Sequence, residues 1–597
     1  MNTNSILLIM PCYNEKPYTW YYFPLGLPYI SAYLKAKGIN VYTLNLNYSY
    51  DFKRSIVEAL ENSKATIVGI SVSTCDIKHC IMIADTVKAF NKDILVAIGG
   101  GVVSGDPEAA MELFINADVG MIGEGEITTY DICKCWFENE SFESIKGIIY
   151  RSGKTYIINK KREDIQEISQ LPWPDLEGFQ YGKYLEINEL QGTSKYLPLL
   201  TSRSCPFSCS FCFHTCGNTY RQRDIDEVFK ELEQRIQNYP VEFISVYDEL
   251  LTANKKRLRE FCDRIAKYNI AWACSVRADF IDDDIISMLK SANCVNATVG
   301  VETHSQSVLN SMEKRIELKK IDRALAELYK RNFSIQCNLI FGDPKETLET
   351  VIESTEWAYQ HPQYFINLAP ILTLPGSKIY RQSIAKLDLE KRKEYLATGD
   401  YAVNLTNCNY KEYSQMLRRI EKCSFSREYL PSSMTVNKKS SNSVQVIANC
   451  QKCDNAISAQ IIVDDIIGVV YCTKCGQYHY FDIDTYFPNS YFSANLLKMT
   501  NMRMRIGILG RNRIAYKVLH VMKSIQYKNV YFYINQQRYL NIPLFGYVPQ
   551  MFSDSRKICD VWIDCMTEDE AKGVDKSGMQ LVTIADLVLN DLSDYIF

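Results

Sequence analysis

The sequence predicts an α/β protein of several domains, in which two parallel sheets precede a small cysteine-rich unit and a last α/β unit. Apolar strands alternate with helices over residues 1–166, and the same alternation returns over residues 190–430. Such alternation indicates parallel sheets, whose ligands lie beyond the carboxyl ends of the strands. Two C-x₂-C pairs follow within residues 445–485, ahead of a further strand and helix in residues 502–597. A chain of 597 residues is also too long for one core.

The composition is that of an ordinary globular protein with many thiols. Hydrophobic residues make up 47% and charged residues 23% of the chain, and a net charge of −3 does not indicate general nucleic-acid binding. The sequence has no apolar run of the roughly 18 residues that a membrane span needs. We therefore expect a cytoplasmic protein without membrane contact. In that reducing compartment, 21 cysteines indicate metal ligands and buried thiols more than disulfides.

The first predicted unit is an open parallel sheet. Its strands are expected at residues 5–10, 41–44, 66–71, 94–99 and 119–123, with helices between them. Candidate cofactor contacts follow the later strands, namely Ser71, Ser73, Gly99, Gly100, Gly101, Gly123 and Glu124. Glycine admits close backbone approach of a ligand, but it also makes a plain turn. The sheet edge is thus a candidate ligand site, for which glycine alone is weak evidence.

The second predicted unit opens with the most specific motif of the chain. Cys205, Cys209 and Cys212 stand in C-x₃-C-x₂-C spacing. Three thiolates hold three irons of a four-iron cluster and leave one iron open for chemistry, whereas a closed cluster takes four. The alternatives are buried thiols or part of a zinc site, although zinc favours paired C-x₂-C motifs. The spacing therefore predicts an iron–sulfur cluster with an open iron.

Repeated strand–helix units after the cysteine loop predict a full or partial parallel barrel, with function at the carboxyl ends of its strands. The expected strands are residues 243–247, 272–276, 297–301, 335–341 and 365–369, after a helix that starts at Asp224. Polar residues follow the strands, namely Asp248, Glu249, Ser275, Arg277, Asp279, Glu302 and Asp343. A surface salt bridge or a helix cap explains each of them about as well as ligand contact does.

The third predicted unit is a small zinc ribbon. Cys450, Cys453, Cys472 and Cys475 form two C-x₂-C pairs with an 18-residue gap, which can hold a hairpin that closes a tetrahedral site. Four thiolates leave zinc no open position, so this site should be structural. The polar stretch Lys438–Val444 before it is a predicted linker.

The last predicted unit, residues 502–597, is a Rossmann-like α/β domain. A strand, a glycine turn at Gly507 to Gly510 and an apolar-faced helix are similar to the start of a nucleotide-binding sheet. The turn lacks the fuller G-x-G-x-x-G pattern, and a structural turn is the preferred interpretation.

The chain resembles the radical S-adenosylmethionine (SAM) superfamily on the cysteine loop, and the order of its first two units resembles the cobalamin-binding class. The resemblance implies that Cys205, Cys209 and Cys212 hold a [4Fe-4S] cluster whose fourth iron SAM chelates. Asp248-Glu249 stands where the family binds the SAM amino group, in place of the common Gly-Gly-Glu. Further SAM contacts are implied by likeness of strand ends, at Ser275, Arg277, Gly300 to Thr303 and Phe341 to Thr347.

The first unit resembles the cobalamin domain of that class. The resemblance is carried by Pro24 to Ile30, Gly99-Gly100-Gly101 and Gly123-Glu124-Gly125-Glu126. Asp-x-His-x-x-Gly is absent from the sequence of this unit, whose only histidine is His79. The resemblance therefore implies cobalamin without a histidine ligand to cobalt. A domain that has lost the cofactor is the alternative, since fold alone does not establish a ligand.

The leading functional prediction is a cobalamin-dependent radical SAM methyltransferase acting on an unactivated carbon or phosphorus centre. The resemblance implies that reductive cleavage of SAM yields a 5′-deoxyadenosyl radical, while cobalamin supplies a methyl group. The alternatives are rearrangement, cyclisation or dehydrogenation without methyl transfer, and a macromolecule-binding protein with a structural cluster. Expected partners are a small-molecule or peptide substrate and a one-electron reductant such as flavodoxin or ferredoxin. His214 and Cys216 should pack near the iron, and Cys337 should be plain core.

Overall fold

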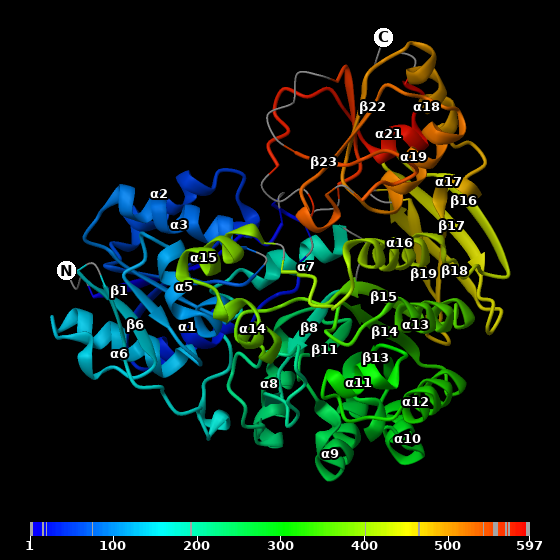
Figure 1. Cartoon of the computed structure of the whole chain (residues 1–597). Coiled ribbons are helices and arrows are strands. Elements are labelled where there is room, and N and C mark those ends of the chain that lie inside the picture. Colours follow the sequence, from blue (N-terminus) through cyan, green and yellow to red (C-terminus); the bar gives the residue numbers. More distant parts are fainter. Residues whose placement is uncertain are drawn as a thin grey trace.

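The computed structural model describes residues 4–592 with short gaps, and these residues form three bodies (Figure 1). The gaps are residues 15–16, 20, 75, 154, 191–193, 400, 464–465, 541, 553–558, 567–569 and 571–573. An N-terminal sheet domain lies beside a partial barrel, and a C-terminal body lies against the barrel (Figure 1). Within the described ranges, no helix is both long and apolar enough to cross a membrane.

The N-terminal domain is a seven-stranded sheet of order β2-β1-β3-β4-β5-β6-β7. Its strands are β1 Ser5–Met10, β2 Asn40–Asn45, β3 Ile67–Ser71, β4 Leu95–Gly99, β5 Val119–Met121, β6 Ile148–Ser152 and β7 Thr155–Ile158. Its helices are α1 Gly26–Ala36, α2 Phe52–Ser63, α3 Ile77–Phe90, α4 Gly101–Gly105, α5 Pro107–Leu113 and α6 Gly125–Phe137. All six residues of β1 are buried because helices cover both faces. The predicted parallel sheet is confirmed for β1 to β5, and the antiparallel β6–β7 edge was not predicted.

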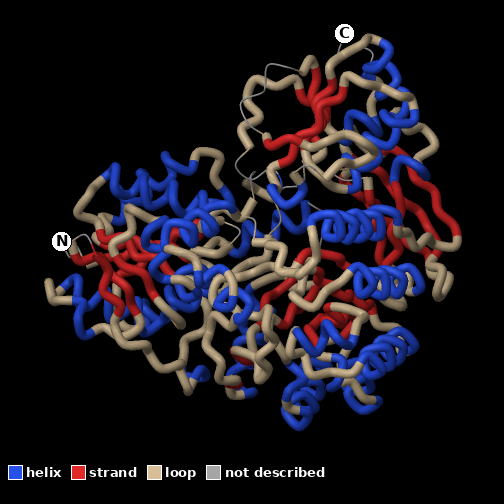
Figure 2. The backbone as a smooth tube through the Cα atoms, in the orientation of Figure 1, coloured by secondary structure: helices blue, strands red, loops and turns tan. Residues whose placement is uncertain are grey.

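The second body is a six-stranded parallel sheet of order β15-β14-β13-β12-β11-β8, which is a partial barrel. Its strands are β8 Tyr196–Leu199, β11 Phe243–Val246, β12 Ala271–Val276, β13 Cys294–Glu302, β14 Ser334–Phe341 and β15 Phe365–Pro370. Its helices are α8 Ile225–Asn238, α9 Lys255–Ile265, α10 Asp283–Ser291, α11 Gln306–Ser311, α12 Leu318–Lys330 and α13 Leu348–Gln360. Figure 2 shows these helices around the strands. The predicted start of α8 is confirmed, since Asp224 accepts hydrogen bonds from the amides of Asp226 and Glu227.

The two faces of the barrel strands differ in burial. Residues that face the helices, such as Cys274, Val299 and Cys337, are buried. Alternate residues, such as Thr298 and Gln336, are only half-buried. A closed barrel fills its interior with bulky branched side chains. Polar, half-buried side chains on the inner face therefore indicate a barrel that is open to solvent on that side.

Two connections join the barrel to the N-terminal domain. The helix α7 (Tyr181–Leu190) precedes β8, and the helices α14 (Lys378–Gln382), α15 (Leu389–Thr398) and α16 (Tyr410–Ser426) follow β15. The helix α15 packs on α5, where Arg392 pairs with Asp106 at 2.7 Å and Glu108 at 3.0 Å. The Tyr380 hydroxyl donates to the Asp106 carboxylate at 2.6 Å. The chain after β15 thus returns to the first domain and holds it against the barrel.

The C-terminal body contains the predicted third and fourth units. It comprises β16 Ser433–Lys438, β17 Ser443–Asn449, β18 Ala456–Ile462, β19 Ile467–Tyr471, β20 Tyr478–Asp482, α17 Ile483–Tyr486 and α18 Phe492–Asn501. A five-stranded parallel sheet of order β23-β22-β21-β24-β25 follows. Its elements are β21 Ile506–Leu509, α19 Arg513–Ser524, β22 Val530–Ile534, β23 Gln550–Met551, β24 Val561–Asp564, β25 Leu581–Val582 and α21 Ile584–Leu589. The last predicted unit is thus a parallel α/β sheet, as expected.

The structure corrects two predictions for this body. The stretch Lys438–Val444 is no linker, because it forms the turn of the β16–β17 hairpin. The gap between the cysteine pairs holds no hairpin, because β18 and β19 belong to different sheets and each C-x₂-C forms the turn of its own hairpin. One apolar cluster, from Tyr413 to Leu592, contains residues of both predicted units, 445–485 and 502–597. A polar turn and a polar linker have the same composition, so the sequence did not distinguish them.

Candidate functional site

The cysteine loop is closed at its base by a two-residue ladder. The strands β9 (Ser202–Arg203) and β10 (Arg221–Gln222) pair antiparallel, with Arg203 opposite Arg221. Ser204 follows with φ of 68°, a left-handed conformation that is uncommon for a residue other than glycine, and its hydroxyl donates to Gly217 O. The loop that carries Cys205, Cys209 and Cys212 is therefore held in one conformation from its two ends.

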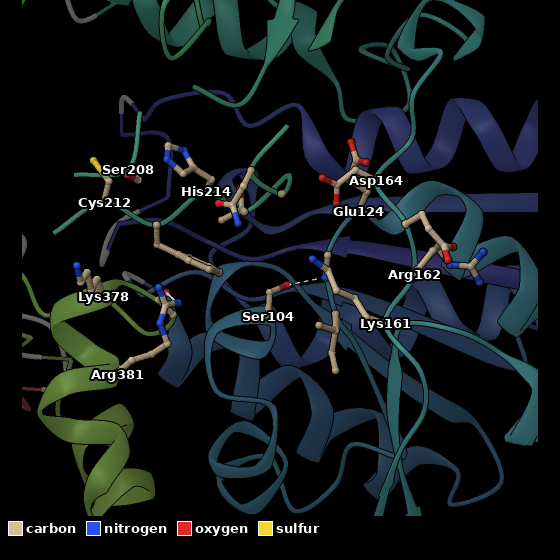
Figure 3. Close-up of a pocket in the computed structure, with 18 of the residues that line it drawn as sticks. Ser104, Glu124, Lys161, Arg162, Asp164, Ser208, Cys212, His214, Lys378 and Arg381 are labelled. Atoms are coloured by element: carbon tan, nitrogen blue, oxygen red, sulfur yellow. Dashed lines mark hydrogen bonds between the residues drawn. The ribbon is translucent and has the colours of Figure 1, made fainter. Parts of the chain in front are cut away.

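A cavity of about 390 Å³ lies between this loop and the N-terminal sheet (Figure 3). Cys209, Cys212 and His214 line it from the loop, while Ser104, Gly123 and Glu124 line it from the sheet edge. Lys378 and Arg381 of α14 lie on a further side (Figure 3). Two predicted cofactor regions that are far apart in sequence therefore open into one space.

The thiols of the loop lie in a positively charged setting. A hydrogen bond from Cys212 and the charges of Lys314 and Arg277 lower the pKa of the Cys209 thiol. The Nη1 atom of Arg277 lies 3.9 Å from Cys209 Sγ. The pKa of the other two thiols is raised, that of Cys212 by its hydrogen bond with Cys209 and that of Cys205 by burial. Three thiols with two cations beside them are the donor set that fits a cluster bound through thiolates.

The predicted SAM residues divide into those bound within the protein and those open to the site. Asp248 is buried, and its two oxygens accept four hydrogen bonds of 2.6 to 3.0 Å from the amides and hydroxyls of Thr201 and Ser202. Four hydrogen bonds use the acceptor capacity of a carboxylate. Asp248 thus holds the strand that leads into the cysteine loop. Glu249 is the carboxylate of this pair that remains 39% exposed.

Glu249 is joined to the cysteine loop through His214. Its Oε2 lies 2.6 Å from His214 Nδ1, and His214 Nε2 lies 3.1 Å from Phe207 O. The hydrogen bond to Glu249 raises the pKa of His214 above its usual value. His214 therefore ties the segment that follows β11 to the loop.

Two of the remaining strand-end residues, Arg277 and Glu302, lie near Cys209. The Arg277 guanidinium pairs with Asp279 at 2.8 Å, donates to Lys314 O and stacks on the Phe207 ring at 4.0 Å. The Lys314 ammonium pairs with Glu302, which adopts φ of 65° at the β13 bulge. Ser275 is half-buried on the inner face of β12. The structure thus brings the predicted Arg277 and Glu302 to the cluster loop, with Lys314 as a partner that the sequence did not single out.

The glycine-rich edge of the N-terminal sheet suits a ligand that approaches the backbone. Gly100 has φ of 105°, and a Cβ there would lie 2.5 Å from Val72 O, so the turn requires glycine. Gly123 has φ of 88° and open space where a Cβ would be. Gly99 pairs with Ser71 at the end of the sheet, and Ser73 donates to Asp76 at 2.9 Å. The edge can admit a large cofactor at Gly123, whereas Ser73 is already paired.

The Glu124 carboxylate is paired within the protein. Its side chain is 4% exposed and pairs with Arg203 and Arg221, each at 2.7 Å. His79 lies apart from this edge cluster, with Nδ1 2.7 Å from Cys12 O and its ring against Phe52. Glu124 thus forms an ion pair between domains, and its contact with cobalamin stays a prediction.

The four predicted zinc ligands do meet. The sulfurs of Cys450, Cys453, Cys472 and Cys475 all lie within 4.8 Å of one another, with two pairs at 3.5 and 3.6 Å. A tetrahedral site with Zn–S of about 2.3 Å needs sulfurs about 3.8 Å apart. The arrangement therefore fits zinc. His479 adds a contact that the sequence did not predict, with Nε2 3.4 Å from Cys450 Sγ.

Two cysteines outside these sites have a structural setting. Cys337 is fully buried and burial raises the pKa of its thiol, as expected for core. Burial also raises the pKa of Cys216, which lies near Arg203. Neither thiol has the exposed, low-pKa character of a reactive cysteine.

Two family models match the chain in the order of its domains. A B12 binding domain matches residues 19–132, and the radical SAM superfamily matches residues 199–358. The chain is therefore a radical SAM protein of the cobalamin-binding class, and it is an enzyme. The two domains imply a [4Fe-4S] cluster, SAM and cobalamin as its cofactors.

Curated relatives and solved structures agree with this class. An uncharacterized methyltransferase of Pyrococcus horikoshii is 25% identical over 407 residues, which are 66% of this chain and 86% of that protein. The anaerobic magnesium-protoporphyrin IX monomethyl ester cyclase of Rubrivivax gelatinosus is 25% identical over 391 residues, 62% and 68% of the two chains. The methyltransferase TsrM of Kitasatospora setae, solved with cobalamin and a [4Fe-4S] cluster, has a TM-score of 0.54 at 17% identity and covers 63% of this chain and 74% of its own. At that identity the structural likeness is one of fold.

Proposed function

We propose that this chain is a cobalamin-dependent radical SAM methyltransferase that acts on an unactivated carbon or phosphorus centre. The observation that carries the proposal is the shared cavity of about 390 Å³, into which both Cys212 and the Gly123 edge open. Methyl transfer by this route requires both cofactors to face one substrate. The likeness to the Pyrococcus horikoshii methyltransferase supports it.

The proposal assigns roles to the cysteines and to several of the other predicted site residues. Cys205, Cys209 and Cys212 would hold the cluster, Ser275 and the open carboxylate of Glu249 would contact SAM, and the Gly99 and Gly123 edges would receive cobalamin. When bound, these groups supply an adenosyl radical and a methyl group. The protein aligns them, since Arg277 fixes the loop beside Cys209. The four-thiol site would hold a structural zinc ion.

The substrate and the electron donor belong to the proposal as well. We expect a small-molecule or peptide substrate and a one-electron reductant such as flavodoxin or ferredoxin. A cytoplasmic location is expected because an iron–sulfur cluster and many free thiols suit a reducing compartment.

The experiment is a reconstituted anaerobic reaction with methyl-labelled SAM and candidate small molecules from neighbouring genes. Methyl transfer predicts a labelled product together with comparable amounts of 5′-deoxyadenosine and S-adenosylhomocysteine. Deoxyadenosine without homocysteine, beside an unmethylated product, would overturn it. That outcome would favour cyclisation or another rearrangement, a second candidate supported by the Rubrivivax gelatinosus cyclase.

A further inference from the structure

The base of the cluster loop is held by charges from a different domain. Arg203 and Arg221 stand opposite each other where the loop closes. Two guanidinium groups side by side repel each other unless carboxylates lie between them. Both carboxylates that meet them, Glu124 and Glu126, come from the N-terminal domain.

These four charges form a buried, balanced network. Glu124 Oε1 lies 2.7 Å from Arg203 Nη1, and its Oε2 lies 2.7 Å from Arg221 Nη1. Glu126 Oε1 lies 2.6 Å from Arg203 Nη2. Each of the four side chains is at most 6% exposed. Glu124 therefore links the two strands of the loop base, and Glu126 gives Arg203 a second partner.

Both arginines make further contacts, Arg221 within the cysteine loop and Arg203 with the N-terminal domain. Arg221 donates to Thr219 O at 3.0 Å and to Cys216 O, both inside the loop. Arg203 stacks on Tyr29 of α1, with its guanidinium carbon 5.1 Å from the ring centroid. On the opposite side, Asp248 fixes Ser202 to the barrel. The loop is thus held between one barrel carboxylate and two carboxylates of the N-terminal domain.

We infer that Glu124 and Glu126 are positioning residues for SAM cleavage, because they fix the arginines that set where the cluster cysteines lie relative to the cavity. The inference rests on the radical SAM class of the chain and not on methyl transfer. It makes the N-terminal domain necessary for the first chemical step, before any role for cobalamin. A displacement of about 1 Å in a reacting group can lower a rate about 100-fold.

The test compares Glu126→Gln and Glu124→Gln with Glu58→Gln in the full-length, cluster-loaded protein. Glu58 belongs to the same domain, and its pair with Arg54 is exposed, so its loss should change nothing. Glutamine keeps the shape and removes the charge. We measure bound iron, the electron paramagnetic resonance spectrum of the reduced cluster with and without SAM, and 5′-deoxyadenosine formed without substrate.

We expect Glu126→Gln to keep its iron but to form 5′-deoxyadenosine about 10- to 100-fold more slowly. The change that SAM produces in the spectrum of the reduced cluster should shrink in parallel. A lower melting temperature with wild-type spectrum and wild-type cleavage would mean that the network only joins the domains, and this would overturn the inference.

A second variant covers the case in which a lone buried charge prevents folding. Glu126→Gln combined with Arg203→Gln leaves neither charge unpaired. If this double variant folds, holds iron and cleaves SAM like the wild type, the inference is wrong. If it folds and holds iron but cleaves slowly, the inference stands. Arg203→Lys should be intermediate, because one ammonium keeps the charge but cannot bridge Glu124 and Glu126 as the planar fork does.

Discussion

The N-terminal and the C-terminal sheet each have a parallel strand that is followed by a glycine, but the surroundings of the two glycines differ. In the N-terminal sheet, Gly123 ends β5 with open space around it and faces the shared cavity. In the C-terminal sheet, Gly510 ends β21 with φ of 95°, but a Cβ there would lie 2.9 Å from Met566. The edge beyond Gly510 is filled by protein.

The side chains after Gly510 explain why. Arg511 is fully buried and pairs with Glu421 of α16 at 2.6 and 3.0 Å. The Arg511 amide and the Asn512 side chain both donate to Glu570, at 2.6 and 2.8 Å. A nucleotide phosphate at a helix N-terminus would need those donors. The Gly510 turn is therefore closed off by protein groups, whereas Gly123, whose amide donates to Ser104 Oγ at 2.9 Å, still faces a cavity. The structural interpretation of the last unit agrees with this packing.

The largest expected effect is loss of the cluster. Changing Cys205, Cys209 and Cys212 together to alanine should reduce bound iron from about four atoms to none and abolish SAM cleavage. Zinc content should not change, because the four-thiol site lies in the C-terminal body. Elemental analysis and 5′-deoxyadenosine assays check this. Retention of iron and cleavage would show that the cluster lies elsewhere.

The next effect concerns the zinc site and tests whether the C-terminal body can loosen without affecting the barrel. Removal of zinc, or Cys453→Ser, should loosen residues 433–592 as one unit, because they share one apolar cluster. SAM cleavage should stay within about twofold of wild type. Hydrogen exchange followed by mass spectrometry measures this. Faster exchange confined to residues 445–485 would instead support the domain boundary predicted from sequence. Unchanged exchange after proven zinc loss would contradict a structural role for the zinc ion.

The third effect tests the filled glycine turn. Arg511→Ala leaves Glu421 buried without a cation, and breaking a buried pair destabilises by about 3–5 kcal/mol. The matched control is Arg505→Ala, whose pair with Asp560 is exposed, and it should leave the melting transition unchanged. Thermal unfolding monitored in the C-terminal body measures both. Equal behaviour of the two variants would mean that Arg511 does not support the turn.

The sequence predicted those parts of the site whose ligands are close along the chain. Cys205, Cys209 and Cys212 fall within eight residues, and each zinc pair within four, so spacing alone was informative. The role of Glu124 depends on Arg203, 79 positions away, and Asp248 depends on Thr201, 47 positions away. Such pairing follows from tertiary packing, within the barrel for Asp248 and between domains for Glu124, and the sequence analysis did not single it out. The two arginines that flank the cysteine loop, Arg203 and Arg221, are a signal that could have indicated carboxylate partners.

The smallest effect compares two buried carboxylates. Glu421 is paired with the Arg511 guanidinium, whereas Glu346 of the barrel accepts hydrogen bonds from neutral groups. Glu346 follows β14, and its side chain accepts hydrogen bonds from the Gly342 amide at 2.7 Å and the Thr350 hydroxyl at 3.5 Å. Burial raises its pKa from 4.5 to about 7. A raised pKa means that the folded state favours the protonated form.

The sign of the pH dependence follows from that shift. The contribution of Glu346 to stability is present in full below pH 4.5 and is lost as the pH rises to about 7. Each unit of pKa corresponds to about 1.4 kcal/mol, so the loss is at most a few kcal/mol. Glu346→Gln keeps a neutral side chain at every pH. It should unfold like the wild type at pH 4.5 and be the more stable protein at pH 8, as measured by denaturant unfolding. A constant difference between the two proteins across that range would mean that folding does not raise the pKa of Glu346.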